Sequence, residues 1–386
     1  MYNVHQHWDP LKVCAVGSSY SPEFYDYIKN KKVRNAFYKI AEETEEDYQA
    51  LIKFLQSFGV EVIRCHNFER DKCLLYDGTY KSPLMCPRDY TAMIGDKFYM
   101  PTPHNKETLL KILKEGKQYK NIPVDLKNTK NLPSWITDIL TNKVSHATFY
   151  EELEPILNLV EKQGNTVEHV YGLFDHNNAT PVNTAMISRI GKDLYFGTET
   201  YYKIHNHDEL QARASSLFPD YRCHIVDTRG HYDSVFCPVV PGLIVSLYDV
   251  KNYEETFPGW EVIYLPDQSY HALKEFTELR EKTRGKWWVR GEELNDDFTD
   301  FVEKWMTKWV GYVEETVFDV NMLVIDEKNV LCNNYNQKVF DAFAKRGITA
   351  HVINFRHRYF WDAGWHCLTS DLHREGVQTD YFPERG

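Results

Sequence analysis

Short apolar segments alternate with longer amphipathic segments along the chain. Residues 12–17 form a short apolar run that ends at a glycine, which predicts a buried strand. Over residues 42–58 the apolar side chains recur at helical spacing, Gly59 ends this predicted helix, and residues 60–63 resume as a strand. The pattern therefore predicts a unit of strand, helix, glycine and strand.

The helix and strand of this unit recur over residues 208–227, 257–264 and 339–353. Between these copies stand patterns of strand, tight turn and strand, each with turn residues at its centre. These predicted hairpins span residues 93–100, 186–196, 236–246 and 323–331. Together the two patterns indicate about five modules of strand, strand, helix and strand.

Modules of this size cannot each bury an apolar face alone, so a closed ring of modules is the expected arrangement. A doubly wound sheet is the alternative, but it predicts a glycine-rich phosphate loop, and the sequence contains no such motif. We expect a single α/β domain over residues 1–386. Insertions are expected near residues 103–165, which are rich in Lys, and near 267–313, whose four Trp residues form a candidate contact surface for a homo-oligomer.

The acidic composition narrows the range of functions. With a net charge of -11, the chain lacks the basic stripe that binds nucleic acid. The eight Cys residues have no CxxC spacing, which is typical of reduced thiols in a cytoplasmic protein. Neither a secretory signal nor an apolar run long enough to span a membrane is expected.

The strongest chemical signal is a cysteine near the end of the chain. Cys367 follows His366 and is flanked by glycines, which let the backbone approach its neighbours closely. Alone, the pattern also fits an inert, half-buried thiol. A second stretch supplies the partners that a nucleophilic thiol needs, because alternation along a strand would place His231 and Asp233 on one face. That stretch also fits an ordinary solvated strand end.

With these repeats and stretches, the chain resembles the amidinotransferases, in the glycine amidinotransferase branch of the superfamily that modifies guanidino groups. The resemblance is strongest over residues 185–376 and thinner over residues 10–101. It rests on five pieces in the expected order: residues 85–89, 191–193, 231–233 with the turn at 241–242, 321–328, and 364–376. The resemblance implies a five-bladed α/β propeller of the pentein type, in agreement with the module count.

The resemblance also implies a role for each candidate site residue. Cys367 is the expected nucleophile, His231 the general acid and base, and Asp193 the carboxylate that pairs with His231. Asp89 and Asp233 are expected to bind the guanidinium. These residue types suit the chemistry, because two carboxylates hold a planar guanidinium by charge-assisted hydrogen bonds and orient it for attack.

The implied reaction moves an amidino group from arginine to an amine. The thiolate attacks the guanidinium carbon, His231 protonates the departing amine, and an acceptor amine then takes the amidino group from the cysteine. Positive charge from the substrate or from protonated His231 would lower the pKa of the thiol. The ping-pong scheme has small-molecule substrates as its partners and needs no metal or organic cofactor.

Three of these assignments have alternatives. Asp193 lies in a predicted hairpin turn, where Asp is common for turn geometry alone. Asp89 could instead pair with Arg88 at the surface. His366 adjoins the nucleophile, but neighbours on a strand point to opposite faces, so His231 is the preferred base.

Three positions depart from the family pattern. The resemblance aligns Val250 with an arginine that takes the substrate carboxylate in the glycine enzymes, and aligns Glu314 and Glu315 with two serines of the same pocket. Glycine is therefore an unexpected acceptor, and the two acidic residues favour an acceptor with a second amine, such as a diamine or lysine. Arg229 or Lys251 is the predicted partner of the arginine carboxylate.

Two other functions share these residue types. In a deiminase or dihydrolase of the superfamily, water replaces the acceptor amine. The third interpretation is a ring-shaped binding protein without activity. The presence together of a nucleophile, a base and three carboxylates argues against it. Histidine pairs at residues 5 and 7 and at 205 and 207 have no carboxylate or Cys cluster beside them in the sequence, so no metal site is predicted.

Overall fold

The computed structural model contains the repeated strand units that the sequence predicts. It describes residues 1–75, 78–100, 110, 137, 151–170, 183–199, 207–229, 231–247, 253–265, 289–307, 309–310 and 319–385. Within these residues the strands form five three-stranded sheets, with the strand orders β15-β1-β2, β3-β4-β5, β6-β7-β8, β9-β10-β11 and β12-β13-β14.

All five sheets have the same topology. The first strand runs antiparallel to the middle strand, and the third strand runs parallel to it. The strands are β1 (Leu11–Val16), β2 (Glu61–Arg64), β3 (Ala92–Ile94), β4 (Lys97–Met100), β5 (Thr166–His169), β6 (Ile187–Ile190), β7 (Asp193–Glu199), β8 (Arg222–Arg229), β9 (Phe236–Val240), β10 (Leu243–Ser246), β11 (Glu261–Tyr264), β12 (Leu323–Asp326), β13 (Asn329–Cys332), β14 (Thr349–Val352) and β15 (Thr369–Arg374).

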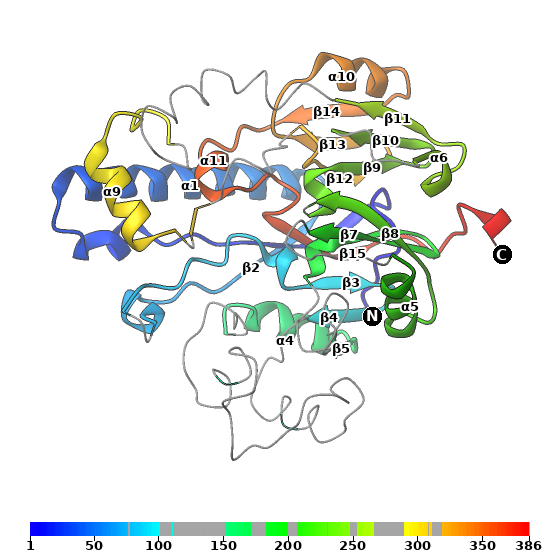
Figure 1. Cartoon of the computed structure of the whole chain (residues 1–386), viewed down its shortest axis with the longest axis horizontal. Coiled ribbons are helices and arrows are strands. Elements are labelled where there is room, and N and C mark those ends of the chain that lie inside the picture. The colour runs from blue at the N-terminus through cyan, green and yellow to red at the C-terminus, as the bar shows by residue number, and fades with distance from the viewer. Residues whose placement is uncertain are drawn as a thin grey trace.

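In each module a helix lies between the middle strand and the third strand, because two parallel neighbours need a crossover connection. These helices are α1 (Lys31–Ser57), α4 (Glu154–Lys162), α5 (His207–Leu217), α6 (Tyr253–Thr256) and α10 (Gln337–Ala344). Figure 1 shows α4, α5, α6 and α10 at the periphery, outside the strands. The four predicted hairpins are confirmed, and so are the helix and strand pairs except for the one at 257–264, where the strand is β11 but the helix α6 ends before the predicted range.

The two ends of the chain share one sheet. Strand β15, near the C-terminus, pairs antiparallel with β1, and Val16 lies opposite Thr369. The predicted helix over residues 42–58 begins earlier than expected, because the Asn30 side chain accepts hydrogen bonds from two backbone N–H groups of the first turn of α1. It ends as predicted, where Gly59 adopts a φ of 73°.

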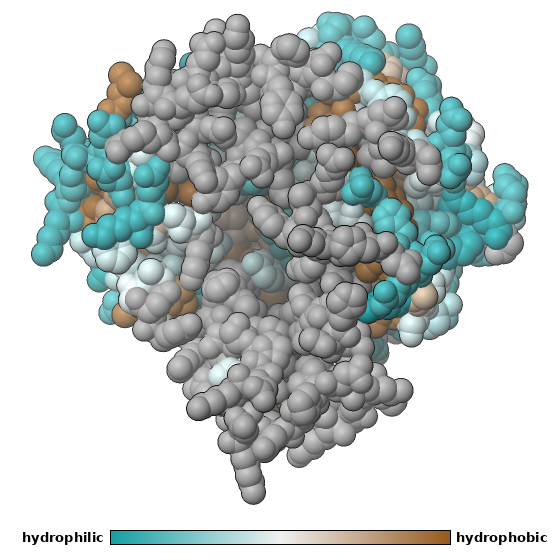
Figure 2. Space-filling view, viewed as in Figure 1, coloured by the Kyte–Doolittle hydropathy of each residue, from teal (hydrophilic) through white to brown (hydrophobic). Residues whose placement is uncertain are grey.

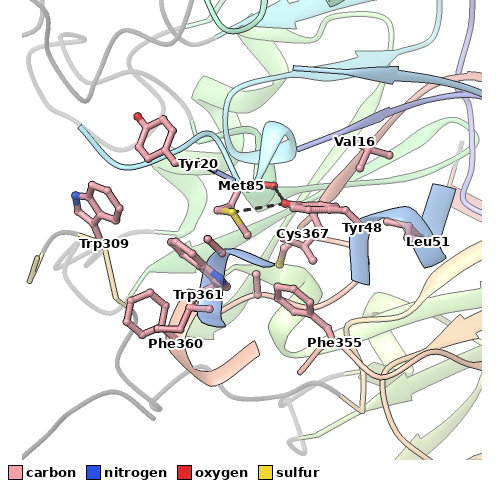
Figure 3. Packing of buried hydrophobic residues seen from close by; sticks show 14 of the residues in the cluster. Val16, Tyr20, Tyr48, Leu51, Met85, Trp309, Phe355, Phe360, Trp361 and Cys367 are labelled. Carbon is pink, nitrogen blue, oxygen red and sulfur yellow. Dashed lines mark hydrogen bonds between the residues drawn. The ribbon is translucent and has the colours of Figure 1, made fainter. Parts of the chain in front are cut away.

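The core consists of apolar clusters between the modules. The largest cluster joins the buried face of α1 to aromatic side chains of the C-terminal region, and Cys367 belongs to it. Figure 3 shows Cys367 within this cluster, together with Tyr48, Met85 and Phe355. The candidate nucleophile is therefore a buried group, 6% exposed.

The two predicted insertions are described only in part. Helix α4 and strand β5 complete the second module, so the C-terminal end of the segment 103–165 belongs to the repeat and not to an insertion. In the segment 267–313, helix α9 (Asp296–Trp305) packs on α1, as Figure 1 shows. Trp309 is buried and donates a hydrogen bond to the Tyr80 carbonyl, whereas Trp305 is exposed.

Short helices complete the described structure. They are α11 (Arg358–Trp361) and the 3-10 helices η1 (Pro22–Tyr27), η2 (Arg70–Cys73), η3 (Pro87–Asp89), η5 (Thr184–Met186), η6 (Tyr232–Ser234) and η8 (Pro383–Arg385). None of the helices among the described residues is long and apolar enough to cross a membrane.

Candidate active site

The site residues occupy the same place in each of the five modules, just before the first strand of the sheet. Asp89 precedes β3, Asn183 precedes β6, Asp233 precedes β9, Asn321 precedes β12 and Cys367 precedes β15. Hydrogen bonds join Cys367 to Asn321 and Asp233, and His231 to Asn183. Contacts between η3, η5 and η6 confirm that three of these segments meet. Figure 2 shows a hollow near the centre of the face viewed in Figure 1.

Cys367 is held by the side chain of Asn321. The Asn321 amide nitrogen lies 2.9 Å from Cys367 Sγ, and its oxygen accepts from the backbone N–H groups of His366 and Cys367 at 3.0 and 3.2 Å. A Cβ atom on Gly364 would lie 2.5 Å from that oxygen. Gly364 therefore permits the close approach that the flanking glycines predicted.

Asp233 joins the thiol to a buried histidine. Its Oδ2 accepts from His366 Nδ1 at 2.7 Å and from the Cys367 thiol at 3.3 Å. Because Nδ1 donates, His366 Nε2 accepts from the Tyr232 hydroxyl at 3.3 Å. Asp233 Oδ1 is buried and has no hydrogen-bond partner among the described residues. A buried carboxylate oxygen of this kind is available to a ligand that donates hydrogen bonds.

The pKa values of this group follow from burial and charge. Burial lowers the pKa of His366 to about 4, with help from the Arg88 guanidinium, so this ring is neutral at pH 7. Burial alone would raise the pKa of Asp233, but the hydrogen bond from His366 and the positive charge of Arg88 outweigh it, and the pKa is lowered. Asp233 is therefore ionised.

The thiol of Cys367 is protonated in the absence of substrate. Its burial raises its pKa well above the ordinary value, and the negative charges of Asp233 and Asp89 raise it further, against the hydrogen bond from Asn321. The thiolate can therefore form only when a bound cation offsets the charges of the two carboxylates.

His231 lies between Asp89 and a residue that the sequence did not predict. Its Nδ1 is 3.9 Å from Asp89 Oδ1, and its Nε2 is 2.9 Å from the amide nitrogen of Asn183. Asp233 is two residues away, in the 3-10 turn η6 that begins after His231. The expected strand alternation of His231 and Asp233 is thus wrong, but the turn still brings both residues to the site.

Asp193 does not pair with His231, which corrects the sequence-based expectation. Its carboxylate binds Arg222 at 2.6 Å, His224 at 2.6 Å and Arg385 at 3.1 Å. Asp193 begins β7 opposite the first residue of β8, and His231 follows the last residue of β8. The length of this strand, roughly 23 Å, separates them.

Two further alternatives are settled by the geometry. Arg88 is buried and forms an ion pair with Asp371 at 3.1 Å, so it is not a surface partner of Asp89. His366 lies in the turn before β15, where strand alternation does not apply, and it reaches Asp233 beside Cys367. Its Nδ1 donates to Asp233 and its Nε2 accepts from the Tyr232 hydroxyl, so His366 is hydrogen bonded at both ring nitrogens.

Several predicted residues lie outside the described part of the structure. These are Val250, Lys251, Glu314, Glu315, His205 and the side chain of Arg229. Among the described residues, no group of three or more His, Cys, Asp or Glu side chains could hold a metal ion. His7, one of the paired histidines, is instead hydrogen bonded to Ser188 at 3.0 Å.

Sequence reasoning missed Asn183 and Asn321. Asn321 stood in one of the pieces that carry the family resemblance but received no role, and Asn183 precedes a predicted hairpin. Their position in the repeat could have identified them. Each lies a few residues before the first strand of its module, as Asp89, Asp233 and Cys367 do.

The curated relatives of the chain are amidinotransferases. The chain is 25% identical over 205 residues to the mitochondrial glycine amidinotransferase of Xenopus laevis, a match that covers 52% of this chain and 40% of the frog protein. It is 22% identical over 206 residues to an L-arginine:L-lysine amidinotransferase of Pseudomonas savastanoi pv. phaseolicola, covering 52% of this chain and 46% of that protein. The matched region thus spans less than half of either relative. No protein-family model matches.

Two solved structures of the same fold are also amidinotransferases. An amidinotransferase of Microseira wollei from saxitoxin biosynthesis superposes with a TM-score of 0.60 at 14% identity, covering 99% of both chains. The inosamine-phosphate amidinotransferase of Streptomyces griseus gives 0.59 at 17% identity, with the same coverage. The α/β fold is shared, and the predicted resemblance to amidinotransferases is confirmed.

Proposed function

We propose that this relative of the amidinotransferases moves the amidino group of L-arginine, or of a related guanidine, to an amine through a covalent amidino-cysteine. The observation that carries the proposal is the pairing of Cys367 with Asp233. The thiol donates to one oxygen of a buried, ionised carboxylate whose other oxygen has no described partner. This arrangement suits a planar cation with several N–H donors and an electrophilic carbon.

Asp89 supplies the second carboxylate of the clamp. Its charge acts on the Cys367 thiol, and its side chain lines a surface pocket together with Tyr90, Trp309 and Trp361. Aromatic faces attract cations, and carboxylates neutralise them. The carboxylate of Asp89 therefore favours a guanidinium or ammonium group over an anion in this pocket.

Substrate binding would itself activate the nucleophile. The same carboxylates that raise the pKa of the Cys367 thiol would be neutralised by a bound guanidinium. The thiol proton is then lost, and the sulfur attacks the guanidinium carbon. This coupling restricts thiolate formation to the occupied site, which protects the cysteine from other electrophiles.

The reaction balances in two halves. In the first, neutral His231 takes the proton of the Cys367 thiol and the C–S bond forms. The bond from the guanidinium carbon to the alkyl nitrogen then breaks, and His231 passes the proton to the departing amine, which is ornithine if arginine is the donor. In the second, neutral His231 takes a proton from the acceptor amine. A new C–N bond forms, the C–S bond breaks, and the thiolate is regenerated.

The repeated topology supports a finer description of the fold. We expect the five sheets to form a five-bladed α/β propeller, with the first strand of each sheet directed toward Cys367. The pairing of β15 with β1 would then complete the first blade from both ends of the chain. The acceptor is proposed to carry a second amine, as lysine does, on the basis of the acidic residues Glu314 and Glu315.

The test is intact-mass spectrometry of the protein mixed with L-arginine, followed by glycine, lysine or putrescine. We expect an amidino adduct on Cys367, release of ornithine, and loss of the adduct when a diamine or lysine is added. Cys367→Ala should abolish the adduct, and Cys223→Ala, which changes a buried thiol at the end of β8 away from His231, should not. Citrulline without an added amine would make the protein a hydrolase. No adduct with any guanidine would overturn the proposal.

A further inference from the structure

Asn183 occupies the position beside His231 where the sequence led us to expect a carboxylate. Its Oδ1 accepts from the backbone N–H of Ala185 at 2.9 Å, and its amide nitrogen lies 2.9 Å from His231 Nε2. A backbone N–H can only donate, so the amide atom that faces Ala185 must be the oxygen. The NH₂ group of Asn183 therefore faces the imidazole.

This contact determines which ring nitrogen of His231 carries the proton. An NH₂ group donates and cannot accept, so Nε2 must present a lone pair to it. In the neutral ring the proton then lies on Nδ1, the nitrogen 3.9 Å from Asp89 Oδ1. Protonation of Nε2 would set two donors against each other, and turning the amide over would sacrifice the bond to Ala185.

The turn that carries Asn183 is itself fixed. Asn183 caps η5, and the next residue, Thr184, donates to the Arg88 carbonyl at 2.6 Å. The segment is thus tied to η3, which carries Asp89. The amide cannot move away from His231 without breaking contacts on both sides, so its effect on the ring is built into the fold.

We infer that Asn183 is a positioning residue that keeps His231 neutral, with its proton on Nδ1, by donating a hydrogen bond to Nε2. The lone pair of the neutral ring is then on Nε2, so an acceptor amine must displace the Asn183 hydrogen bond before the ring can take its proton. The consequence for turnover rests on the proposed function, whereas the tautomer does not. A carboxylate at this position would instead stabilise the imidazolium.

The other charged groups around His231 act in the opposite direction. Among the described residues, Asp89 of η3 and Asp233 of η6 face it and favour its protonated form. The Arg88 guanidinium is directed away, to Asp371, and the segment η5 contributes no charge. Asn183 is thus the contact that offsets two carboxylates.

The first test uses the unaltered protein. Nitrogen-15 NMR of the histidine rings distinguishes protonated from unprotonated ring nitrogens, and the spectrum of His231→Asn identifies the signals. At neutral pH we expect Nε2 of His231 to be unprotonated. His351 is an internal control with the opposite contact, because Asn329 donates to Asp326 and must therefore accept from His351 Nε2. A proton on Nε2 of His231 would overturn the inference.

The second test is Asn183→Asp, which should raise the midpoint of the His231 titration by about one pH unit or more. The acidic limb of the rate profile for amidino transfer should move up by the same amount, an effect that a purely structural role would not produce. An unchanged midpoint would contradict the inference. The expected tautomer in a protein without amidino transfer would support the role of Asn183 and refute the proposed function.

Discussion

At the scale of single residues, the carboxylates beside the candidate nucleophile disfavour its thiolate form until a cation binds. Asp233 is needed to bind a guanidinium, yet its charge raises the pKa of the Cys367 thiol. His366 stays neutral and keeps Asp233 ionised by donating to it. The resting site is therefore a thiol beside a carboxylate, and its reactivity depends on the charge of the ligand.

Replacing Asp233 by Asn separates these two effects. With the charge removed, the pKa of Cys367 should fall, and alkylation by iodoacetamide at pH 8 should become roughly fivefold faster or more, since one pKa unit changes the thiolate fraction about tenfold. Adduct formation with arginine should be lost, because the clamp is broken. Asp220→Asn, at the surface, serves as the control. Slower alkylation in Asp233→Asn would show that the carboxylate activates the thiol directly.

At the scale of elements, one end of the β7 and β8 pair carries an ion network and the other end leads to the candidate site. At the start of β7, Asp193 forms ion pairs with Arg222, the first residue of β8, and with Arg385. The pair with Arg385 connects the C-terminal turn η8 to this sheet. The far end of β8 leads to His231 and the site. The same sheet thus separates a stabilising ion network from the chemistry.

Asp193→Asn should reduce stability and leave amidino transfer intact. Breaking a buried ion pair costs about 3 kcal/mol or more, because the partner charges remain. Burial opposes ionisation of Asp193, but hydrogen bonds from His224 and Arg222 prevail and lower its pKa in the folded protein. The stabilisation is therefore present above the unfolded value of about 3.9 and is lost as the pH falls through the lower folded value.

Urea unfolding at several pH values measures this dependence. The difference between the wild type and Asp193→Asn should be constant above about pH 5 and should shrink below about pH 4. Asp380→Asn is the matched control, since Asp380 binds the same Arg222 from a more exposed position and should cost less. Loss of amidino transfer in folded Asp193→Asn would restore its catalytic assignment.

At the scale of the whole molecule, a buried charge cluster connects the modules. Asp371 of β15 pairs with Arg88, Arg189 and Arg374 at 3.1, 2.7 and 2.8 Å. Arg189 also donates to the Met93 carbonyl of β3, and Arg374 donates to a carbonyl of β12. Burial opposes ionisation of Asp371, but the three guanidiniums hold its pKa well below the usual range. One carboxylate thus links four sheets.

Asp371→Asn should destabilise the protein by about 3–5 kcal/mol, because three buried guanidiniums lose their counter-ion. Adding Arg189→Met should recover part of this loss by removing one uncompensated charge. Midpoints of urea unfolding give both values. Glu375→Gln, which affects an exposed pair with Lys12, is the control and should change the midpoint little. An unchanged midpoint in Asp371→Asn would refute the structural role of the cluster.

The sequence alone determined the repeating order of strands and helices, since hydrophobic periodicity and turn residues are local properties. Apolar spacing placed α1, α5 and α10, and turn residues placed the hairpins, including that of β6 and β7. Helix α4 was hidden in a segment rich in Lys, where charge masks the short apolar stripe of Ile156, Leu157 and Val160. The sequence also singled out Cys367, His231, Asp89 and Asp233, which the fold brings to one region.

Only the tertiary structure decided which side chains meet. The family resemblance implied Asp193 as the partner of His231, but the register of β7 and β8 places them at opposite ends of a sheet. Asn183 and Asn321 carry no charge and form no motif, so their contacts with His231 and Cys367 arise only when the modules assemble. Hydrogen bonds and pKa shifts depend on distances of a few ångströms across modules, which local patterning does not encode.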